Sequence, residues 1–150
     1  MPTLRSKSRD GNTGGAVLEF AVLLPALALI LFGAGDFGRA FYHAVTVSNA
    51  AETGAFYGSQ NVILSGHYDE MAQAAREDAK DVGTVSTSAN RFCSCPGGAV
   101  VDCINGTCAG YGAPRVYVRC QVQRTFNTLV NLPGLPDLFP VRRDVYMRVQ

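Results

Sequence analysis

The reactive side chains of this 150-residue chain are few, and the cysteines are the most concentrated of them. All of them lie in its C-terminal half: Cys93, Cys95, Cys103, Cys108 and Cys120. Such a cluster forms disulfides in an oxidising compartment, whereas in the cytosol the same spacing would suggest zinc. Two alternatives follow, a domain stapled by disulfides with one thiol left over, which we favour, or a zinc module built on the first four cysteines.

The dipeptide Asn105-Gly106 is the strongest hairpin signal in the cysteine region. A two-residue turn there would place Cys103 opposite Cys108, with Cα atoms about 4.5 Å apart, near the lower limit for a disulfide. We therefore expect a Cys103–Cys108 bond, although cysteine spacing alone does not determine connectivity.

The other three cysteines are harder to pair. Cys93 and Cys95 would point to the same face of a strand, which places them poorly for a bond to each other. Cys120 falls within a separate strand pattern and could pair with one of them, which would tie the small hairpin to the main sheet.

The rest of the chain offers no recognisable catalytic arrangement. His43 and His67 stand outside any metal-binding or catalytic spacing, and we expect both to be solvated surface residues. The sequence contains no G-x-S-x-G, no H-E-x-x-H and no phosphate-binding loop. A formal net charge of +1 argues against a nucleic-acid binder. We therefore predict a non-enzymatic protein that needs no cofactor and binds no nucleic acid.

A long apolar segment near the N-terminus contains one charged residue. Between Ala16 and Gly35 the only ionisable side chain is that of Glu19. About 20 residues at roughly 1.5 Å per residue match a hydrocarbon core of about 30 Å. A carboxylate costs roughly 2.5–3.5 kcal/mol at the bilayer centre and less toward the interface. We therefore expect Glu19 to have a partner charge, a processing enzyme or an assembly contact.

The charges that flank this segment predict its orientation and the domain organisation. Arg5, Lys7 and Arg9 precede it, so the positive-inside rule places the N-terminus in the cytoplasm. Residues 1–14 are then a basic leader, residues 15–35 a transmembrane helix and residues 36–150 one exported domain.

A secretory signal peptide is the alternative interpretation of the same N-terminus. The small residues Gly33-Ala34-Gly35 would suit its cleavage site, and the product would be a soluble, disulfide-stapled binding domain. The apolar stretch exceeds the usual length of about 7–15 residues, however, and Glu19 stands at its start, so we favour the membrane helix.

The patterns beyond the apolar segment predict an α+β domain. The first helix should continue to about Tyr57, and a second should span 68–82, with Gly83 as its C-terminal cap. Alternating residues in 116–123 and 141–149 predict paired antiparallel strands joined by a turn over 131–137, with shorter strands near Phe92 and Val100. The exported half of the first helix should carry an apolar stripe with four-three spacing, which would face either the core or a subunit interface and is made of Phe37, Phe41, Ala44, Ser48, Ala51 and Ala55.

Small residues also recur on this helix at every fourth position, as Ala50, Gly54 and Gly58. Such a stripe lets another backbone approach closely. The approaching backbone could belong to another subunit or to this protein's own sheet, and the spacing does not decide between them.

Several of these stretches together resemble the TadE-like family, pilin-like (pseudopilin) proteins of the tight-adherence branch of type IV pili. The similar stretches are the Gly-Gly-Ala-Val-Leu-Glu-Phe run at 14–20, the Asp-Phe-Gly-Arg run at 36–39, the segment 48–55, and the cysteine-rich hairpin with the closing strand. The resemblance implies a pilin-like fold in a single-pass protein of the bacterial inner membrane, with its C-terminal domain outside the cytoplasm.

The resemblance also implies a function and partners. A prepilin peptidase would cleave between Gly14 and Gly15, which would make Glu19 the fifth residue of the mature chain, or one residue later, which would make it the fourth. The protein would be a minor pilin or pseudopilin that acts in assembly of a Tad-type pilus for adhesion or secretion. Its partners would be the lipid bilayer, other pilin subunits and the inner-membrane Tad assembly proteins. Glu19 would pair with the new α-amino group of a neighbouring subunit, since a buried ion pair costs less than two lone charges.

Overall fold

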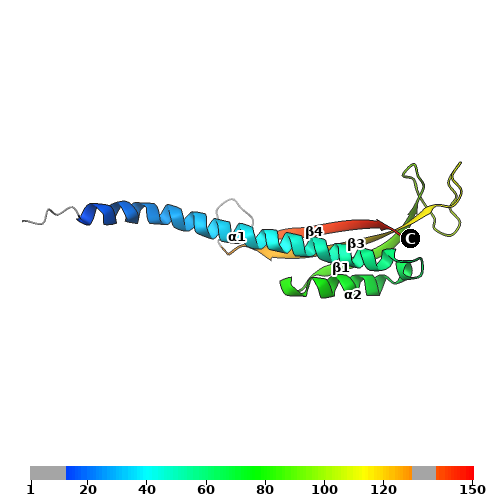
Figure 1. Ribbon diagram of the computed structural model, residues 1–150, viewed down its shortest axis with the longest axis horizontal. Coiled ribbons are helices and arrows are strands. Elements are labelled where there is room, and N and C mark those ends of the chain that lie inside the picture. The colour runs from blue at the N-terminus through cyan, green and yellow to red at the C-terminus, as the bar shows by residue number, and fades with distance from the viewer. Residues whose placement is uncertain (1–12, 130–137) are drawn as a thin grey trace, which may run out of the picture.

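One helix, α1 (Thr13–Ser59), forms the long axis of the molecule. The computed structural model describes residues 13–129 and 138–150. With 47 residues at about 1.5 Å each, α1 is roughly 70 Å long. Its N-terminal half extends away from every other element, while its C-terminal half lies along the sheet and the second helix (Figure 1). The predicted continuation to about Tyr57 is confirmed, and Pro25 lies inside the helix without ending it.

Three short helical segments follow α1: η1 (Leu64–Gly66), α2 (Tyr68–Asp78) and η2 (Lys80–Val82). The predicted second helix therefore exists but ends four residues early, at Asp78, where a 3-10 turn replaces the α-helix. Gly83 follows that turn with a φ of 83° and donates its N–H to the carbonyl of Lys80. The predicted stop signal is thus real, but it ends the 3-10 turn.

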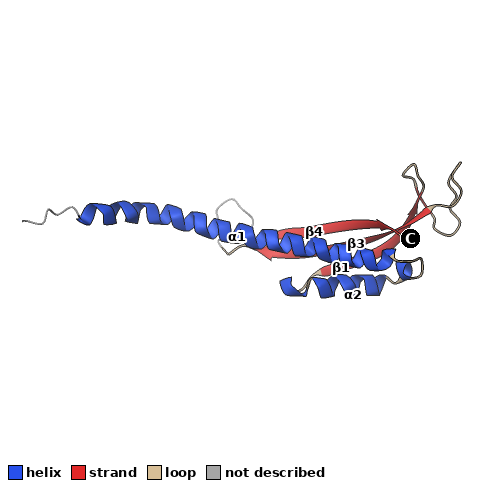
Figure 2. Cartoon of the chain, viewed as in Figure 1, coloured by secondary structure: helices blue, strands red, loops and turns tan. Residues whose placement is uncertain are grey.

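The strands form one antiparallel sheet in the order β2-β1-β3-β4 (Figure 2). Their bounds are Ser86–Ser94 for β1, Val100–Val101 for β2, Arg115–Asn127 for β3 and Leu138–Arg148 for β4. The predicted pair is β3 with β4, and the predicted pieces near Phe92 and Val100 are β1 and β2. The predicted α+β, pilin-like fold is confirmed, whereas the predicted turn over 131–137 lies outside the described residues.

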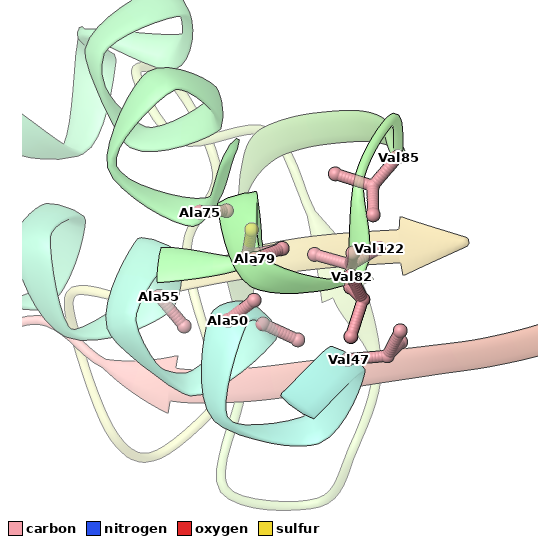
Figure 3. Close-up of a cluster of buried hydrophobic side chains, with 10 residues drawn as sticks. Val47, Ala50, Ala55, Ala75, Ala79, Val82, Val85 and Val122 are labelled. Carbon is pink, nitrogen blue, oxygen red and sulfur yellow. The ribbon is translucent and has the colours of Figure 1, made fainter. Parts of the chain in front are cut away.

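The core lies between one face of the sheet and the two helices (Figure 3). The alternation in β3 is confirmed, because Val118, Cys120 and Val122 are fully buried toward the helices. Most of the helix residues that meet them are small, so the helix and strand backbones lie close together. The helix residues of the core are Val47, Ala50, Ala51 and Ala55 on α1, Met71, Ala72 and Ala75 on α2, and Ala79 and Val82 just beyond it.

The predicted apolar stripe of α1 packs into the core over part of its length, because Ala51 and Ala55 are fully buried. Phe37 and Phe41 are 74% and 63% exposed, and full burial among the described residues begins at Val47. The core alternative is therefore correct for Ala51 and Ala55, whereas Phe37 and Phe41 do not belong to the core. The two aromatics lie on the same row of α1, before the level at which full burial begins, and they remain largely exposed.

The opposite face of the sheet is not covered by either helix (Figure 2). It carries polar and aromatic side chains, among them those of Arg119, Asp144, Phe92 and Tyr117. Arg119 on β3 donates two hydrogen bonds to Oδ1 of Asp144 on β4, at 2.9 and 2.6 Å. These charge-assisted bonds hold the pKa of Asp144 below its ordinary value. Phe92 stacks on Tyr117 with ring centroids 5.5 Å apart. This arrangement is typical of an antiparallel sheet with one solvated face.

Candidate functional site

The predicted processing and assembly residues occupy the first turns of α1. Gly14 and Gly15 are exposed, and a Cβ at either position would meet no other atom within 4 Å. Glu19 is exposed one turn further along. None of the three contacts the folded domain, so the domain itself gives them no structural role.

The surface around Glu19 is apolar and unprotected. The described part of the chain contains one helix long and apolar enough to cross a membrane, and the apolar window of that helix is not buried inside the fold. Large side chains such as Leu18, Phe20 and Leu23 are mostly exposed along it. A water-facing helix with this surface would be costly, since apolar area stabilises by about 25 cal/mol per Å² when it leaves water. The helix is therefore consistent with a single pass through a bilayer.

The small-residue stripe packs within the protein. A Cβ on Gly54 would lie 2.5 Å from Sγ of Cys120 and 2.8 Å from the carbonyl oxygen of Met71. A Cβ on Gly58 would lie 2.5 Å from Sδ of Met71, and Ala50 is fully buried in the core. Of the two readings left open by the spacing, the internal one is correct: the stripe lets α1 approach α2 and β3, and it is not a free subunit interface.

The disulfides differ from the predicted pairing. Cys93 is bonded to Cys103 and Cys95 to Cys108, with Cα–Cα distances of 5.1 and 5.5 Å. The predicted Cys103–Cys108 bond is therefore wrong. The expectation that Cys93 and Cys95 would not bond each other is confirmed. With all four sulfurs in disulfides, these cysteines supply no thiolate for the alternative zinc module.

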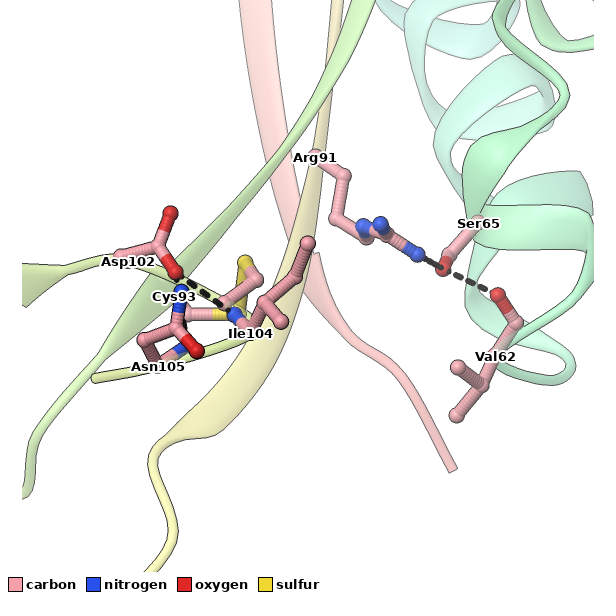
Figure 4. Close-up of a disulfide and its surroundings, with 8 residues drawn as sticks. Val62, Ser65, Arg91, Cys93, Asp102, Ile104 and Asn105 are labelled. Carbon is pink, nitrogen blue, oxygen red and sulfur yellow. Dashed lines mark hydrogen bonds between the residues drawn. A yellow bond between two sulfur atoms is a disulfide. The ribbon is translucent and has the colours of Figure 1, made fainter. Parts of the chain in front are cut away.

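The physical reason for the wrong pairing is the local turn. Asn105 and Gly106 do not form a two-residue hairpin, because the turn is closed one residue wider, by the N–H of Gly106 donating to the carbonyl of Asp102 at 3.0 Å. The carboxylate of Asp102 accepts the N–H groups of Ile104 and Asn105 at 2.9 and 2.7 Å (Figure 4). This side-chain cap holds the turn and points Cys103 toward β1.

Cys120 is the free thiol of the described residues, so the pairing with Cys93 or Cys95 that was considered for it does not form. It is fully buried in the middle of β3, beneath Gly54 of α1. Burial raises the pKa of the Cys120 thiol to about 11. A protonated, buried thiol behaves as a small apolar side chain, which explains its position among valines.

A cluster that the sequence interpretation missed joins α1 to the end of β3. The backbone N–H of Leu129 donates to both carboxylate oxygens of Asp36, at 3.1 and 3.0 Å. Arg39 contacts Asp36 at 3.3 Å, and its guanidinium lies 5.3 Å from the ring centre of Phe126. The one available signal was the presence of Asp36 and Arg39 at the end of the apolar run. These contacts anchor the end of the sheet where β3 finishes and β4 starts, here called the β3–β4 end, to α1. The anchor lies at the first charged residues of α1 after its apolar run.

His43 belongs to the same cluster, and the prediction that it is solvated is wrong. Its ring lies 5.2 Å from that of Phe126, and its Nδ1 is, within the described segments, a buried atom without a hydrogen-bond partner. Burial, together with the nearby Arg124 and Arg39, lowers the pKa of His43. His67 is exposed, as predicted, with Nδ1 3.5 Å from Glu70.

Comparisons with known proteins give one match. No similar protein is found among the curated proteins, and none is found among the solved structures. The family model described as TadE-like protein matches residues 14–55. The matched segment contains Gly14, Gly15 and Glu19, the exposed apolar half of α1 and most of its packed half. Over residues 14–55 the chain is therefore similar to TadE-like proteins, as the sequence resemblance predicted.

Proposed function

We propose that this protein is a membrane-anchored, pilin-like component that acts in assembly of a Tad-type pilus. The observation that carries the proposal is the TadE-like match over residues 14–55. This match lies on α1, whose first half is apolar and not buried against the domain. A helix of this kind has two environments open to it, a bilayer or the helices of other subunits, and a pilin-like protein would use both in turn. The domain supplies no catalytic constellation within its described residues, so its role would be structural.

Processing at the start of α1 is part of this proposal. Cleavage between Gly14 and Gly15, or one residue later, would remove the basic leader and create a new α-amino group four or three residues before Glu19. The two glycines are exposed and free of contacts, which would leave them accessible to a prepilin peptidase. The orientation would place the leader in the cytoplasm and the sheet outside it.

The first experiment is mass spectrometry of the mature N-terminus on protein purified from the native membrane. The proposal predicts a start at Gly15 or Ala16. A start near Asp36 would instead indicate a signal peptide and a secreted domain, although such a cut would sever α1 within a continuous helix. An intact Met1 would contradict prepilin-type processing.

The second experiment tests Glu19 itself. Glu19→Ala should abolish or strongly reduce pilus assembly while leaving the protein folded and in the membrane, because the charge partner of the neighbouring amine is lost. Glu52→Ala is the matched control, since Glu52 is an exposed carboxylate on the same helix outside the apolar half. Normal assembly with Glu19→Ala would refute the role of Glu19.

A further inference from the structure

An apolar groove lies where the bare half of α1 meets the rest of the fold. It has a volume of about 550 Å³ and is lined on one side by Leu29, Phe32 and Gly33 of α1, and on the other by Phe126, Phe139 and Val141 of β3 and β4. Figure 1 shows the ends of these two strands lying beside α1 at the point where it leaves the domain. The groove is therefore built jointly by the apolar helix and the sheet.

The chemistry of the groove is almost wholly hydrocarbon. Asp36 is the one ionisable residue among the described residues that line it. Its carboxylate is already engaged by the N–H of Leu129 and by Arg39, so it does not present a free charge to an occupant. An occupant that fits these walls is apolar and needs no hydrogen-bonding partner.

The level of the groove along α1 follows from helix geometry. Asp36 and Arg39 are the first charged residues after the apolar run, so they mark where headgroups or water begin. Gly33 and Leu29 lie about 4.5 and 10 Å from Asp36 along the axis, on the apolar side. The groove thus lies at the edge of the hydrocarbon layer, if the helix spans a bilayer as proposed above.

The sheet side of the groove is itself unusually apolar for a strand end. Leu129, just beyond β3, is 69% exposed, and Phe139 at the start of β4 is 37% exposed. Leu29 and Phe32, on the α1 side, are likewise large, apolar and exposed. The apolar surface that α1 offers to lipid therefore extends onto the β3–β4 end.

We infer that this groove holds an acyl chain of a membrane phospholipid, so that the β3–β4 end is immersed in the bilayer surface. The inference rests on the proposed membrane anchoring. A second helix fits less well, because a helix about 10 Å wide occupies roughly 420 Å³ per turn, and the groove would admit little more than one turn of it. An acyl chain is narrower and needs no backbone partner.

Tryptophan fluorescence tests this placement directly, because the chain contains no tryptophan. Phe139→Trp places a single reporter in the groove, and Leu129→Trp is a second reporter at an exposed position that tolerates the change. Each full-length variant is reconstituted in phosphatidylcholine vesicles with and without bromine on the acyl chains. Both reporters should lose most of their emission to the brominated lipid. Quenching of both by aqueous acrylamide alone would overturn the inference.

Two reference reporters separate this inference from the proposed function. Phe20→Trp lies in the bare half of α1 and should be quenched by brominated lipid, whereas Tyr111→Trp lies on an exposed loop beyond the sheet and should not be. If Phe20→Trp is quenched and the groove reporters are not, the groove inference fails and the membrane anchor stands. If Phe20→Trp is not quenched either, the membrane anchor fails as well.

A variant that fills the groove gives a further test, with a matched control on the same helix. Gly33→Leu adds a side chain where no atom lies within 4 Å, and it should reduce the lipid quenching of Phe139→Trp. Gly35→Leu adds the same side chain to the same helix, at a glycine that does not line the groove, and should leave the quenching unchanged. Quenching that increases as the protein is diluted with lipid would show that a second copy occupies the groove, which would overturn the inference.

Discussion

Gly54 of α1 lies directly against the thiol of Cys120 on β3: a Cβ at position 54 would be 2.5 Å from Sγ. The same Cβ would be 2.8 Å from the carbonyl oxygen of Met71, which belongs to the α2 backbone and cannot rotate away. The long helix, the second helix and the central strand thus meet at one glycine. This contact explains why the middle of β3 carries a side chain as small as cysteine, whose thiol is free because the other four cysteines form two disulfides with one another.

Replacement of Gly54 should therefore destabilise the domain. Gly54→Ala overpacks a three-element junction, and we expect a loss of about 1–3 kcal/mol in the free energy of unfolding. Gly38→Ala, on the same helix with no atom within 4 Å, is the matched control and should be neutral or stabilising, because alanine favours the helix. Thermal unfolding of the full chain in detergent, followed by circular dichroism, measures both. Equal stability of the two variants would contradict the packing described here.

The interleaved disulfides give a prediction about covalent structure. Peptide mapping without reduction should recover Cys93–Cys103 and Cys95–Cys108, with Cys120 alkylated only after unfolding. The double variant Cys95→Ser/Cys108→Ser opens a loop with a separation of 13 residues, and by chain-entropy arguments should lose roughly 2–4 kcal/mol of stability. Recovery of a Cys103–Cys108 peptide would contradict these two pairings and support the two-residue hairpin predicted from the sequence.

Cys120 should make stability depend on pH under alkaline conditions. Burial raises the pKa of its thiol in the folded protein from 9.0 to about 11, so between these values the unfolded chain releases a proton that the folded chain keeps. The contribution is fully present below pH 9 and is lost as pH rises toward 11. Urea unfolding of the wild type and of Cys120→Ala across this range measures the effect. The wild type should lose more stability than the variant, and parallel curves would contradict the prediction.

Asp36 should hold the end of β3 against α1. Asp36→Ala removes the acceptor of the Leu129 N–H, and the exchange of that amide with solvent should accelerate by about tenfold, the equivalent of roughly 1.4 kcal/mol. Hydrogen–deuterium exchange of the full chain measures the exchange rate of the Leu129 amide. Glu52→Ala, an exposed carboxylate further along α1, serves as the control and should leave Leu129 unchanged. Unaltered exchange in Asp36→Ala would mean that other contacts hold the strand end.

The elements that were predicted correctly are those whose pattern depends on burial alone. The alternation in β3 and the apolar face of α2 follow directly from a sheet with one covered face and a helix packed on it. Phe37 and Phe41 share a row of α1 with the buried Ala51 and Ala55, yet they stay exposed. Periodicity shows which residues share a row, but not how far along the helix a partner covers that row.

The cysteine pairing and the Asp36 cluster were beyond pattern reasoning for a different reason. The Asp102 carboxylate caps its own turn and widens it by one residue, which moves Cys103 away from Cys108. Asp36 and Leu129 are 93 residues apart, and their contact exists because the whole sheet returns to the helix. The Asp36–Leu129 contact depends on tertiary geometry. The Asp102 cap is local to its turn, but the Asn105-Gly106 hairpin signal indicated a different turn at the same place.

The unbroken course of α1 has a mechanical consequence. In a bilayer, helices tilt by about 20° on average, and a rod about 70 Å long with that tilt shifts its far end sideways by roughly 24 Å. Because the sheet and α2 are packed rigidly on the far half of the same helix, they must follow that swing. If the apolar half of α1 spans a bilayer as proposed, it acts as the short arm of a lever, and bilayer thickness or helix–helix contacts inside the membrane would shift the position of the disulfide-bonded loops at the other end.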